Sequence, residues 1–375
     1  MSKAKHFDVA VIGGGVIGMS LTWRLSQRKA SVAVIDSKLP GQATHAAAGM
    51  LAPLSDAASE STLLDLGLAS LEKYSGFVQE IAELVKSPLQ IEGAGILRIA
   101  RDEDEAKRLK AMFRRRTHLG LPLEMLTPED LREAEPQLTP DALLAILSPA
   151  EQHIQPRLLL EALEKAAKHA GAAIYSGESV TKIDGDASEL YTVHTDARAV
   201  SCDHLVICGG AWSGSLAELL PKAVLPVTPL KGHLGALDAS SGSPLRHTIC
   251  AGDCYLVPRE NGELVFGATE EPEAQFDPET HPYTISRLRL DAEALVPALS
   301  GLALLSGWSG LRPASPDGLP ILGRMSRGKN IYAATGHGRN GILLAPQTAD
   351  LLTSCILGGH NPPKAFDPSR FHNTK

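Results

Sequence analysis

Val11-Ile12-Gly13-Gly14-Gly15-Val16-Ile17-Gly18 stands near the start of the chain and contains the glycine pattern of a nucleotide-binding turn. The apolar residues 7–12 before the glycines are typical of a buried parallel strand. Residues 16–27 have helical apolar spacing, and residues 31–35 form a second apolar run. We therefore expect a strand, a helix and a parallel strand in succession, which is one βαβ unit.

Three glycines and an acid have separate physical roles in this unit. Gly13 permits the tight turn, Gly15 lets a pyrophosphate approach the backbone, and Gly18 lets the helix pack closely on the strand. The start of the helix then offers amide donors and positive potential to phosphates. Asp36 ends the second strand, where a carboxylate can accept from ribose hydroxyls and disfavours a 2′-phosphate. A dinucleotide site is expected, and a turn that serves only packing is the alternative.

The stretch Thr44-His45-Ala46-Ala47-Ala48-Gly49-Met50 bears on which dinucleotide is bound. Small residues just after the acid-bearing strand let the chain pass close to a bulky, flat ligand. The early start of the glycine motif is also common where FAD binds extended across one large site. Both features favour FAD over NAD, and a small-residue helix start in ordinary packing is the alternative.

A second glycine turn, Gly336-His337-Gly338-Arg339-Asn340-Gly341, lies between an expected strand at 330–335 and an expected helix at 340–357. The start of that helix could point its amides at an anionic group. In a flavoenzyme the target would be the N1–C2=O edge, where negative charge develops on reduction. A strand-to-helix turn without a ligand is the alternative.

Arg312 and Tyr255 are candidate substrate ligands. Arg312 stands in a segment with too much glycine and proline for a helix, and we expect it in a loop. An arginine there can bind a carboxylate bidentately, which lysine cannot match. Tyr255, in an apolar strand, could offer its hydroxyl to the same carboxylate. An ordinary surface arginine and a core tyrosine are the alternatives.

The remaining pattern predicts an α/β fold with two domains. A Rossmann-like FAD-binding domain with a mostly parallel sheet is expected from 1–85, 145–220 and 325–365, and an α+β substrate domain built on an antiparallel sheet from 86–144 and 221–324. An Asn-Gly hairpin turn is expected at 259–262, and a surface strap after Gly358. Further helices are expected at 63–85, 102–116, 155–170 and 285–296, and further strands at 91–100, 172–175, 190–193, 204–207, 254–257 and 263–266.

Composition excludes several classes of function. The chain has 375 residues, a net charge of −7 and 4% aromatic residues, without a basic patch, which gives no support to nucleic-acid binding. No signal-peptide pattern or uninterrupted apolar run of spanning length is evident, so we expect no membrane association and a cytoplasmic location. The five cysteines, including Cys250 and Cys254, lack a ligand set for zinc, and no metal is expected.

With these residues in view, the chain resembles the D-amino-acid oxidase family of FAD-dependent oxidoreductases, and within it the glycine oxidases of thiamine biosynthesis. The resemblance covers nearly the whole chain. Its first motif is shared by many flavoproteins, whereas its last three together are much more specific. The motifs are residues 11–18, Ala46-Ala47-Ala48-Gly49-Met50-Leu51, Trp212-Ser213-Gly214, Cys254-Tyr255-Leu256-Val257-Pro258-Arg259, Gly267-Ala268-Thr269, Gly310-Leu311-Arg312-Pro313, Asp317-Gly318-Leu319-Pro320 and residues 336–346.

The resemblance implies specific roles for these residues. Arg312 would clamp the carboxylate of an amino acid with help from Tyr255, and Arg339 would lie near that carboxylate and the flavin. Related sarcosine oxidases hold flavin through a cysteine near the arginine; this chain has none there, so FAD is expected to be non-covalent. The expected FAD contacts are Gly13, Gly15, Ile17, Gly18, Asp36, Ser37, Thr44, His45, Ala48, Gly49, Met50 at the isoalloxazine, Val180 on the adenine side, Gly210, Trp212, Gly338, Arg339, Asn340, Gly341 and Ile342.

One position departs from the family pattern. After Gly-Ala-Thr, glycine oxidases carry an apolar methionine, whereas this chain has Glu270 followed by Glu271. The carboxylate of Glu270 could lie near the substrate amine and favour small ammonium substrates, or it could point away. Glu270 is therefore a candidate substrate-binding residue.

The expected reaction is oxidative deamination of glycine, and then of sarcosine and small D-amino acids, by molecular oxygen. It would yield the 2-oxo acid, ammonia or an amine, and hydrogen peroxide, and would supply thiamine thiazole synthesis. No side chain is expected to act as an acid or base, and the chain is expected to form a homo-oligomer. The alternatives are a D-amino-acid dehydrogenase that reduces a quinone, a flavin domain for tRNA modification, and a non-catalytic nucleotide-binding scaffold.

Overall fold

The N-terminal βαβ unit has the expected form in the computed structural model, which describes residues 4–56, 62–117, 122–185, 190–221, 223–325 and 330–371. Strand β1 (Lys5–Ile12) leads into helix α1 (Val16–Gln27) and then strand β2 (Val32–Asp36). The two strands pair in parallel. The apolar runs, the helical spacing and the glycine turn therefore predicted this unit correctly.

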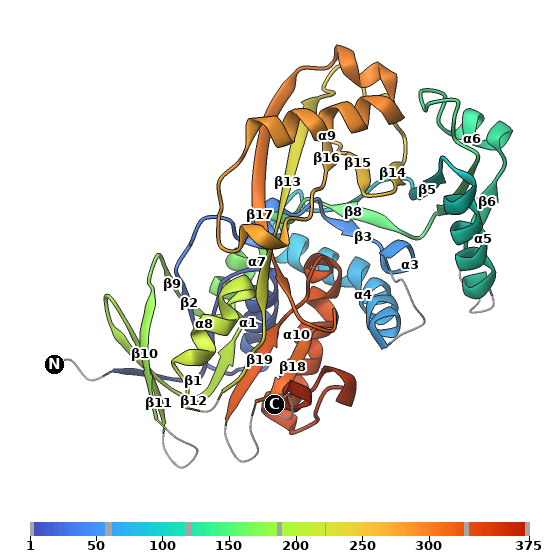
Figure 1. Cartoon of the computed structure of the whole chain (residues 1–375). Helices are drawn as coiled ribbons and strands as arrows, with labels where there is room; N and C mark the ends of the chain where they lie inside the picture. Colours follow the sequence, from blue (N-terminus) through green and yellow to red (C-terminus); the bar gives the residue numbers. More distant parts are fainter. Residues whose placement is uncertain are drawn as a thin grey trace.

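The first large sheet extends from this unit and has the order β10-β11-β12-β1-β2-β9, with β19 on β12 and β18 on β19 (Figure 1). Pairing is parallel for β12, β1, β2, β9 and β19, and antiparallel for β10, β11 and β18. The bounds are β9 (Ala173–Ser176), β10 (Val180–Asp184), β11 (Tyr191–Thr195), β12 (Ala199–Ile207), β18 (Ile321–Arg324) and β19 (Ile331–Thr335).

Four helices from distant parts of the chain share the core on one face of this sheet. They are α1, α4 (Thr62–Val85), α7 (Pro156–His169) and α10 (Gly341–Gly358). Trp23 of α1 and Phe77 of α4 meet edge-on, with ring centroids 5.3 Å apart. The core on this face of the first large sheet is therefore formed by helices that are far apart in the sequence, from α1 to α10.

The second large sheet has the order β17-β13-β16-β15-β14-β5-β7-β6. All of its pairs are antiparallel except β14 with β5, which is parallel. Helix α9 (Pro282–Leu295) packs its apolar side on this sheet (Figure 1). The strand bounds are β5 (Ile96–Ala100), β6 (Glu124–Leu126), β7 (Leu144–Ser148), β13 (Thr228–Asp238), β14 (Thr248–Ala251), β15 (Cys254–Pro258), β16 (Glu263–Gly267) and β17 (Leu304–Ala314).

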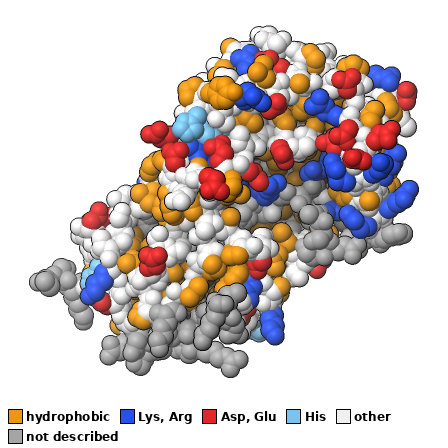
Figure 2. All heavy atoms as spheres, viewed as in Figure 1, with side chains coloured by type: hydrophobic (Ala, Val, Ile, Leu, Met, Phe, Trp, Pro, Cys, Tyr) orange, Lys and Arg blue, Asp and Glu red, His pale blue; other side chains and the backbone are white. Residues whose placement is uncertain are grey.

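Short elements connect the two large sheets. A small antiparallel sheet has the order β3-β8-β4. One connecting element, helix α5 (Glu103–Thr117), has acidic residues in its first turn and arginines in its last turn. Figure 2 shows basic side chains gathered over this helix. The remaining bounds are β3 (Met50–Leu51), β4 (Ile91–Glu92), β8 (Gln152–Ile154), α2 (Ala43–Ala46), α3 (Pro53–Asp56), α5 (Glu103–Thr117), α6 (Pro128–Ala134), α8 (Ser213–Glu218), η1 (Gly210–Trp212), η2 (Pro272–Ala274), η3 (Pro297–Gly301), η4 (Lys364–Phe366) and η5 (Pro368–Phe371).

The expected α/β fold with one parallel and one antiparallel sheet is confirmed, with differences in detail. Arg312 lies in strand β17 and not in a loop. Strand β7 belongs to the antiparallel sheet, although the expected boundary at residue 145 assigns it to the FAD side. Strand β18 belongs to the parallel sheet, although it precedes the expected boundary at residue 325. We propose that the domains divide as these two sheets do.

Helix α10 is long and apolar enough in composition to cross a membrane, a property that a search for uninterrupted apolar runs did not reveal. Sixty-one per cent of it is buried within the protein, as in the core helix of a soluble protein. It packs between α1 and α4. The chain then continues as the expected strap, which is held by buried Phe366 and by Arg370, whose Nε donates to Asp317 over 2.7 Å.

Candidate active site

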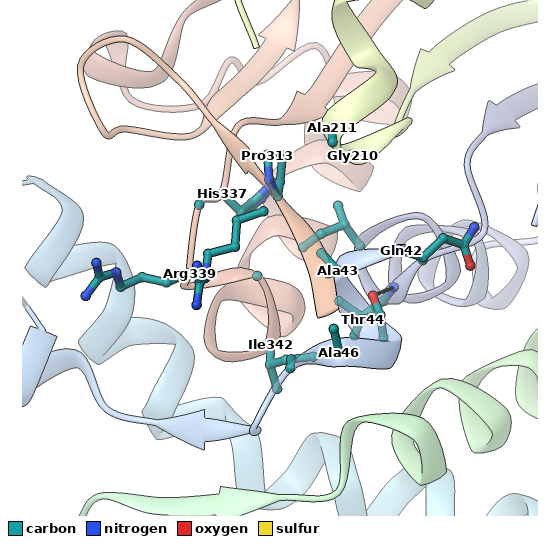
Figure 3. Close-up of a pocket in the computed structure, with 18 of the residues that line it drawn as sticks. Gln42, Ala43, Thr44, Ala46, Gly210, Ala211, Pro313, His337, Arg339 and Ile342 are labelled. Carbon is teal, nitrogen blue, oxygen red and sulfur yellow. Dashed lines mark hydrogen bonds between the residues drawn. The ribbon is translucent and has the colours of Figure 1, made fainter. Parts of the chain in front are cut away.

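A cavity of about 520 Å³ lies between the two large sheets, at the carboxyl ends of β1, β2, β12 and β19. Figure 3 shows Gln42, Ala43 and Thr44 on one side of it, with His337 and Arg339 on another. Gly18 and His45 do not line it, although both were expected to contact FAD. The expected residues that do line it are Gly13, Gly15, Ile17, Asp36, Ser37, Thr44, Ala48, Gly49, Met50, Val180, Gly210, Trp212, Tyr255, Glu270, Arg312, Gly338, Arg339, Asn340, Gly341 and Ile342.

The first glycine turn leaves no room for a side chain at Gly13 or at Gly18. Gly13 has φ of +112°, and a Cβ there would lie 2.2 Å from the carbonyl oxygen of Cys208. A Cβ on Gly18 would lie 2.0 Å from the carbonyl oxygen of Gly13. Gly18 thus serves the close packing of α1 on its strand and not contact with the cavity.

The start of α1 faces the cavity and is supported by Thr44. The Val16 N–H donates to Thr44 Oγ1 over 3.1 Å, in a buried position. The backbone at Gly14 and Gly15 lines the cavity beside it. Amide groups at the first turn of a helix attract phosphate oxygens, so this end of the cavity fits a pyrophosphate.

Asp36 offers a buried acceptor to the same end of the cavity. Its side chain is 4% exposed, and Oδ1 accepts from Gln42 Nε2 over 3.1 Å. Oδ2 has no hydrogen-bond partner among the described residues, and Lys38 Nζ lies 3.3 Å away. A Cβ on Gly14 would lie 2.9 Å from Oδ2. An open carboxylate oxygen beside a bare glycine fits a ribose hydroxyl, so the residues present suit the adenosine half of FAD.

The second glycine turn forms the opposite end of the cavity. Gly338 has φ of +55°, and its N–H donates to the carbonyl of Pro313 over 2.8 Å, which ties the turn to the end of β17. Burial lowers the pKa of His337 to about 3, so its imidazole is neutral beside the cavity. The turn leads directly into α10, whose first residues line the cavity. The positive end of this helix can therefore stabilise negative charge on a bound flavin.

Arg312 and Tyr255 share the part of the cavity lined by the antiparallel sheet. Arg312 Nη1 donates to the carbonyl of Thr269 over 3.1 Å, and no carboxylate pairs with Arg312 among the described residues. Gly232 leaves room for the guanidinium, since a Cβ there would lie 2.5 Å from Nη1. Burial raises the pKa of Tyr255 to about 12, against the opposing effect of Arg312, so the hydroxyl keeps its proton. A guanidinium without a counter-ion beside a phenol donor suits a substrate carboxylate.

Arg339 and Glu270 form an ion pair at the rim of the cavity. The guanidinium of Arg339 donates to the carboxylate of Glu270, and the two side chains are 54% and 46% exposed. Of the two possibilities for Glu270, near the substrate amine or pointing away, the structure has it directed at Arg339. The neighbouring Glu271 binds His233 instead, over 2.7 Å.

Several cavity residues carried no recognisable signal in the sequence. Arg98 of β5 lies in one row with Cys250 and Tyr255 across β14 and β15, and its Nε has no hydrogen-bond partner in the part of the chain that the structure describes. Only the sheet register brings these three residues together. Three cysteines also line the cavity, and burial raises the pKa of Cys208 and of Cys254 to about 12, so both remain thiols.

Together, a glycine turn that fits a pyrophosphate, a carboxylate that fits a ribose, a helix start that can stabilise negative charge and an arginine that suits a carboxylate fit a flavin-dependent oxidoreductase. Comparison with known proteins agrees. Residues 8–355 match the model of the FAD dependent oxidoreductase (DAO) family, and the chain belongs to this family. The resemblance to the D-amino-acid oxidase type is thereby confirmed.

Comparisons with two related sequences and one crystal structure show which members of the family the chain is similar to. The chain is 32% identical to a glycine oxidase of Geobacillus kaustophilus, over 99% of this chain and 97% of that protein. It is 34% identical to the bifunctional protein ThiO/ThiG of Synechocystis over 98% of this chain, and spans 54% of that longer protein. The crystal structure of glycine oxidase from Geobacillus kaustophilus superimposes with a TM-score of 0.92 at 30% identity, covering 98% of this chain and 99% of that one.

Proposed function

We propose that this enzyme oxidises glycine, and then sarcosine and small D-amino acids, with molecular oxygen. The products are the 2-oxo acid, ammonia or an amine, and hydrogen peroxide. The observation that carries the proposal is Arg312, a cavity arginine that contacts a neutral carbonyl and, among the described residues, no carboxylate, next to protonated Tyr255. The glycine oxidases among its relatives, and the ThiO/ThiG proteins, support glycine as the substrate and thiamine thiazole synthesis as the purpose.

In the proposed reaction the side chains position the substrate. Arg312 and Tyr255 hold the carboxylate, so that the Cα–H bond is directed into the cavity. FAD, when bound, would supply the hydride acceptor and the capacity for reoxidation by oxygen. The amine enters without its extra proton, and therefore no side-chain base is required; water then hydrolyses the imine to the 2-oxo acid and ammonia. Positioning supplies much of the catalysis.

Oxygen uptake by the yellow holoenzyme tests the proposal. Glycine, sarcosine and D-alanine should each consume oxygen and form peroxide without an added acceptor. The D-amino-acid dehydrogenase alternative predicts turnover only when a quinone is added. A protein that cannot be reconstituted with FAD would contradict both.

Variants of Arg312 test the carboxylate site. Arg312→Ala should raise KM for glycine by about 100-fold or more, since the buried carboxylate loses a charged partner. Arg312→Lys should recover only part of this loss, because lysine cannot bind bidentately. Arg132→Ala, at an exposed arginine of α6 that pairs with Glu129, is the matched control. Unchanged glycine turnover in Arg312→Ala would show that the carboxylate binds elsewhere.

We also propose a cytoplasmic homo-oligomer. Apolar side chains are exposed on α9 and at the start of β17, and Figure 2 shows hydrophobic side chains gathered over α9. Tyr283 is 72% exposed and Leu290 59%. Self-association would cover such a surface. Sedimentation of the holoenzyme and fractionation of cells test the two statements separately.

A further inference from the structure

Two consecutive residues after β16, Thr269 and Glu270, contact two of the three arginines that line the cavity. The carbonyl of Thr269 accepts from Arg312, and the carboxylate of Glu270 accepts from Arg339. Arg312 therefore keeps its net positive charge, because its partner is neutral. The charge of Arg339 is balanced by a full negative charge. One short segment thus makes two otherwise similar guanidinium groups electrostatically unequal.

The backbone on both sides of Glu270 is anchored. Thr269 Oγ1 accepts from the His233 N–H over 2.9 Å, and it donates to the carboxylate of Glu271. The Glu271 N–H donates to the carbonyl of Lys231 over 2.9 Å. Because Glu270 lies between two residues fixed to β13, its Cα has a defined position. The ion pair with Arg339 therefore starts from an anchored backbone, and both side chains remain half exposed.

The pair joins the two halves of the cavity. Glu270 follows the antiparallel sheet, whereas Arg339 belongs to the turn between β19 and α10 of the parallel sheet. Both residues line the cavity, and both are about half exposed, which places them where the cavity opens to solvent. If Arg312 binds one carboxylate of a substrate, a second acid group could bind Arg339 only by displacing the carboxylate of Glu270.

We propose that Glu270 is a specificity-determining residue that occupies Arg339 and so restricts the enzyme to amines with a single carboxylate. This inference rests on the proposed function, because it assumes that Arg312 binds the substrate carboxylate. Without Glu270, Arg339 becomes a second anion-binding group. The affinity for ligands with two acid groups then increases relative to the affinity for ligands with one.

Binding of acetate and malonate to the holoenzyme, followed by the change in flavin absorbance, tests the inference. Glu270→Gln should bind malonate about tenfold more tightly relative to acetate than the wild type does. The double variant Glu270→Gln/Arg339→Gln should lose this gain, as a double-mutant cycle requires. Arg98 is present in every variant, so its effect on the ligands cancels. The kcat/KM ratio of D-aspartate to D-alanine should rise in Glu270→Gln in parallel.

Glu273→Gln is the matched control, because Glu273 is an exposed acid three residues along the chain. If it produces the same gain, the effect is one of general charge, and the inference is overturned. An unchanged malonate-to-acetate ratio in Glu270→Gln, or a gain that persists in the double variant, overturns it too. Failure of the proposed function is distinguishable: the wild type would then not oxidise glycine, whereas the ligand titrations need no turnover.

Discussion

Tyr74 donates its hydroxyl to the carbonyl of Ile342 over 2.9 Å, inside the protein. In an uninterrupted helix that carbonyl would accept from the N–H of residue 346, but residue 346 is a proline and has none. Ser70 of α4 similarly donates to the carbonyl of Leu343 over 2.6 Å. Two hydroxyl groups of α4 thus complete the first turns of α10, the part of the helix that lines the cavity.

Tyr74→Phe should therefore affect both stability and cofactor binding. It leaves a buried carbonyl without a donor, at a cost of about 1–3 kcal/mol in the free energy of unfolding. FAD affinity should fall as well, because the start of α10 borders the cavity. Urea unfolding and a fluorescence titration of apoprotein with FAD measure the two effects. Tyr283→Phe, at a tyrosine that is 72% exposed, should change neither, and equal behaviour of the two variants would contradict the interpretation.

Asp36→Asn should weaken FAD binding. The substitution keeps the shape of the side chain and removes the charge from Oδ2, which has no hydrogen-bond partner among the described residues and only Lys38 Nζ, 3.3 Å away, as an ion-pair partner. Loss of a charged hydrogen bond corresponds to about tenfold or more in Kd. Titration of apoprotein with FAD measures it, and Asp196→Asn, at an exposed turn, serves as the control. An unaltered Kd would mean that the ribose lies elsewhere.

The flavin should leave the protein on denaturation. Non-covalent binding is expected because the cavity cysteines Cys208 and Cys254 remain protonated, with pKa values of about 12, and a thiol is a poor nucleophile. After acid precipitation the yellow colour should appear in the supernatant. Colour retained in a washed precipitate would indicate a covalent bond, and mass spectrometry of peptides would locate it.

Asp277 should make stability depend on pH in the acid range. The hydrogen bond from Lys231, whose side chain is fully buried, lowers the pKa of the Asp277 carboxyl from 3.8 to about 2. A lowered folded-state pKa means that the contribution is present above about pH 4 and is lost as the pH falls toward 2. The difference in urea midpoint between wild type and Asp277→Asn should therefore shrink over that interval. The exposed Glu279→Gln should show no such trend, and a constant difference for Asp277→Asn would be evidence against the assignment.

The sequence predicted the cofactor half of the fold well because its signals are local. Residues 16–27 were expected to be a helix, and α1 has those bounds. Asp36 was expected at the end of a strand, where β2 places it. In each case a periodicity or a glycine turn decides the structure within a few residues.

Arg312 was expected in a loop, but it lies in a strand. The nearby Gly310 and Pro313 are explained by tertiary contacts of that strand. Pro313 belongs to the edge strand β17, where a missing N–H costs little, and it lies opposite Pro229 of β13. A Cβ on Gly310 would lie 2.2 Å from the Cβ of Ala46, so this glycine allows a close approach of α2. Residues that indicate a loop in isolation here permit a packed strand.

The pairing of Glu270 with Arg339 could not be predicted for a different reason. The two residues are 69 positions apart and lie in loops that follow strands of different sheets. No periodicity connects them, and only the closure of the cavity between the sheets brings them together. Local patterns in the sequence therefore predicted the class of fold, but not this contact between distant loops.

The cofactor-side sheet is assembled from strands near both ends of the chain, and α1 packs directly on α10. During synthesis, the N-terminal βαβ unit must therefore wait for residues beyond 341 before its apolar face is covered. A ribosome-bound chain that has not yet released α10 lacks residues that line the cavity, so we expect it to bind FAD weakly. Cofactor acquisition is thus expected after α10 has been synthesised, and termination before α10 would yield an exposed, aggregation-prone chain without FAD-dependent activity.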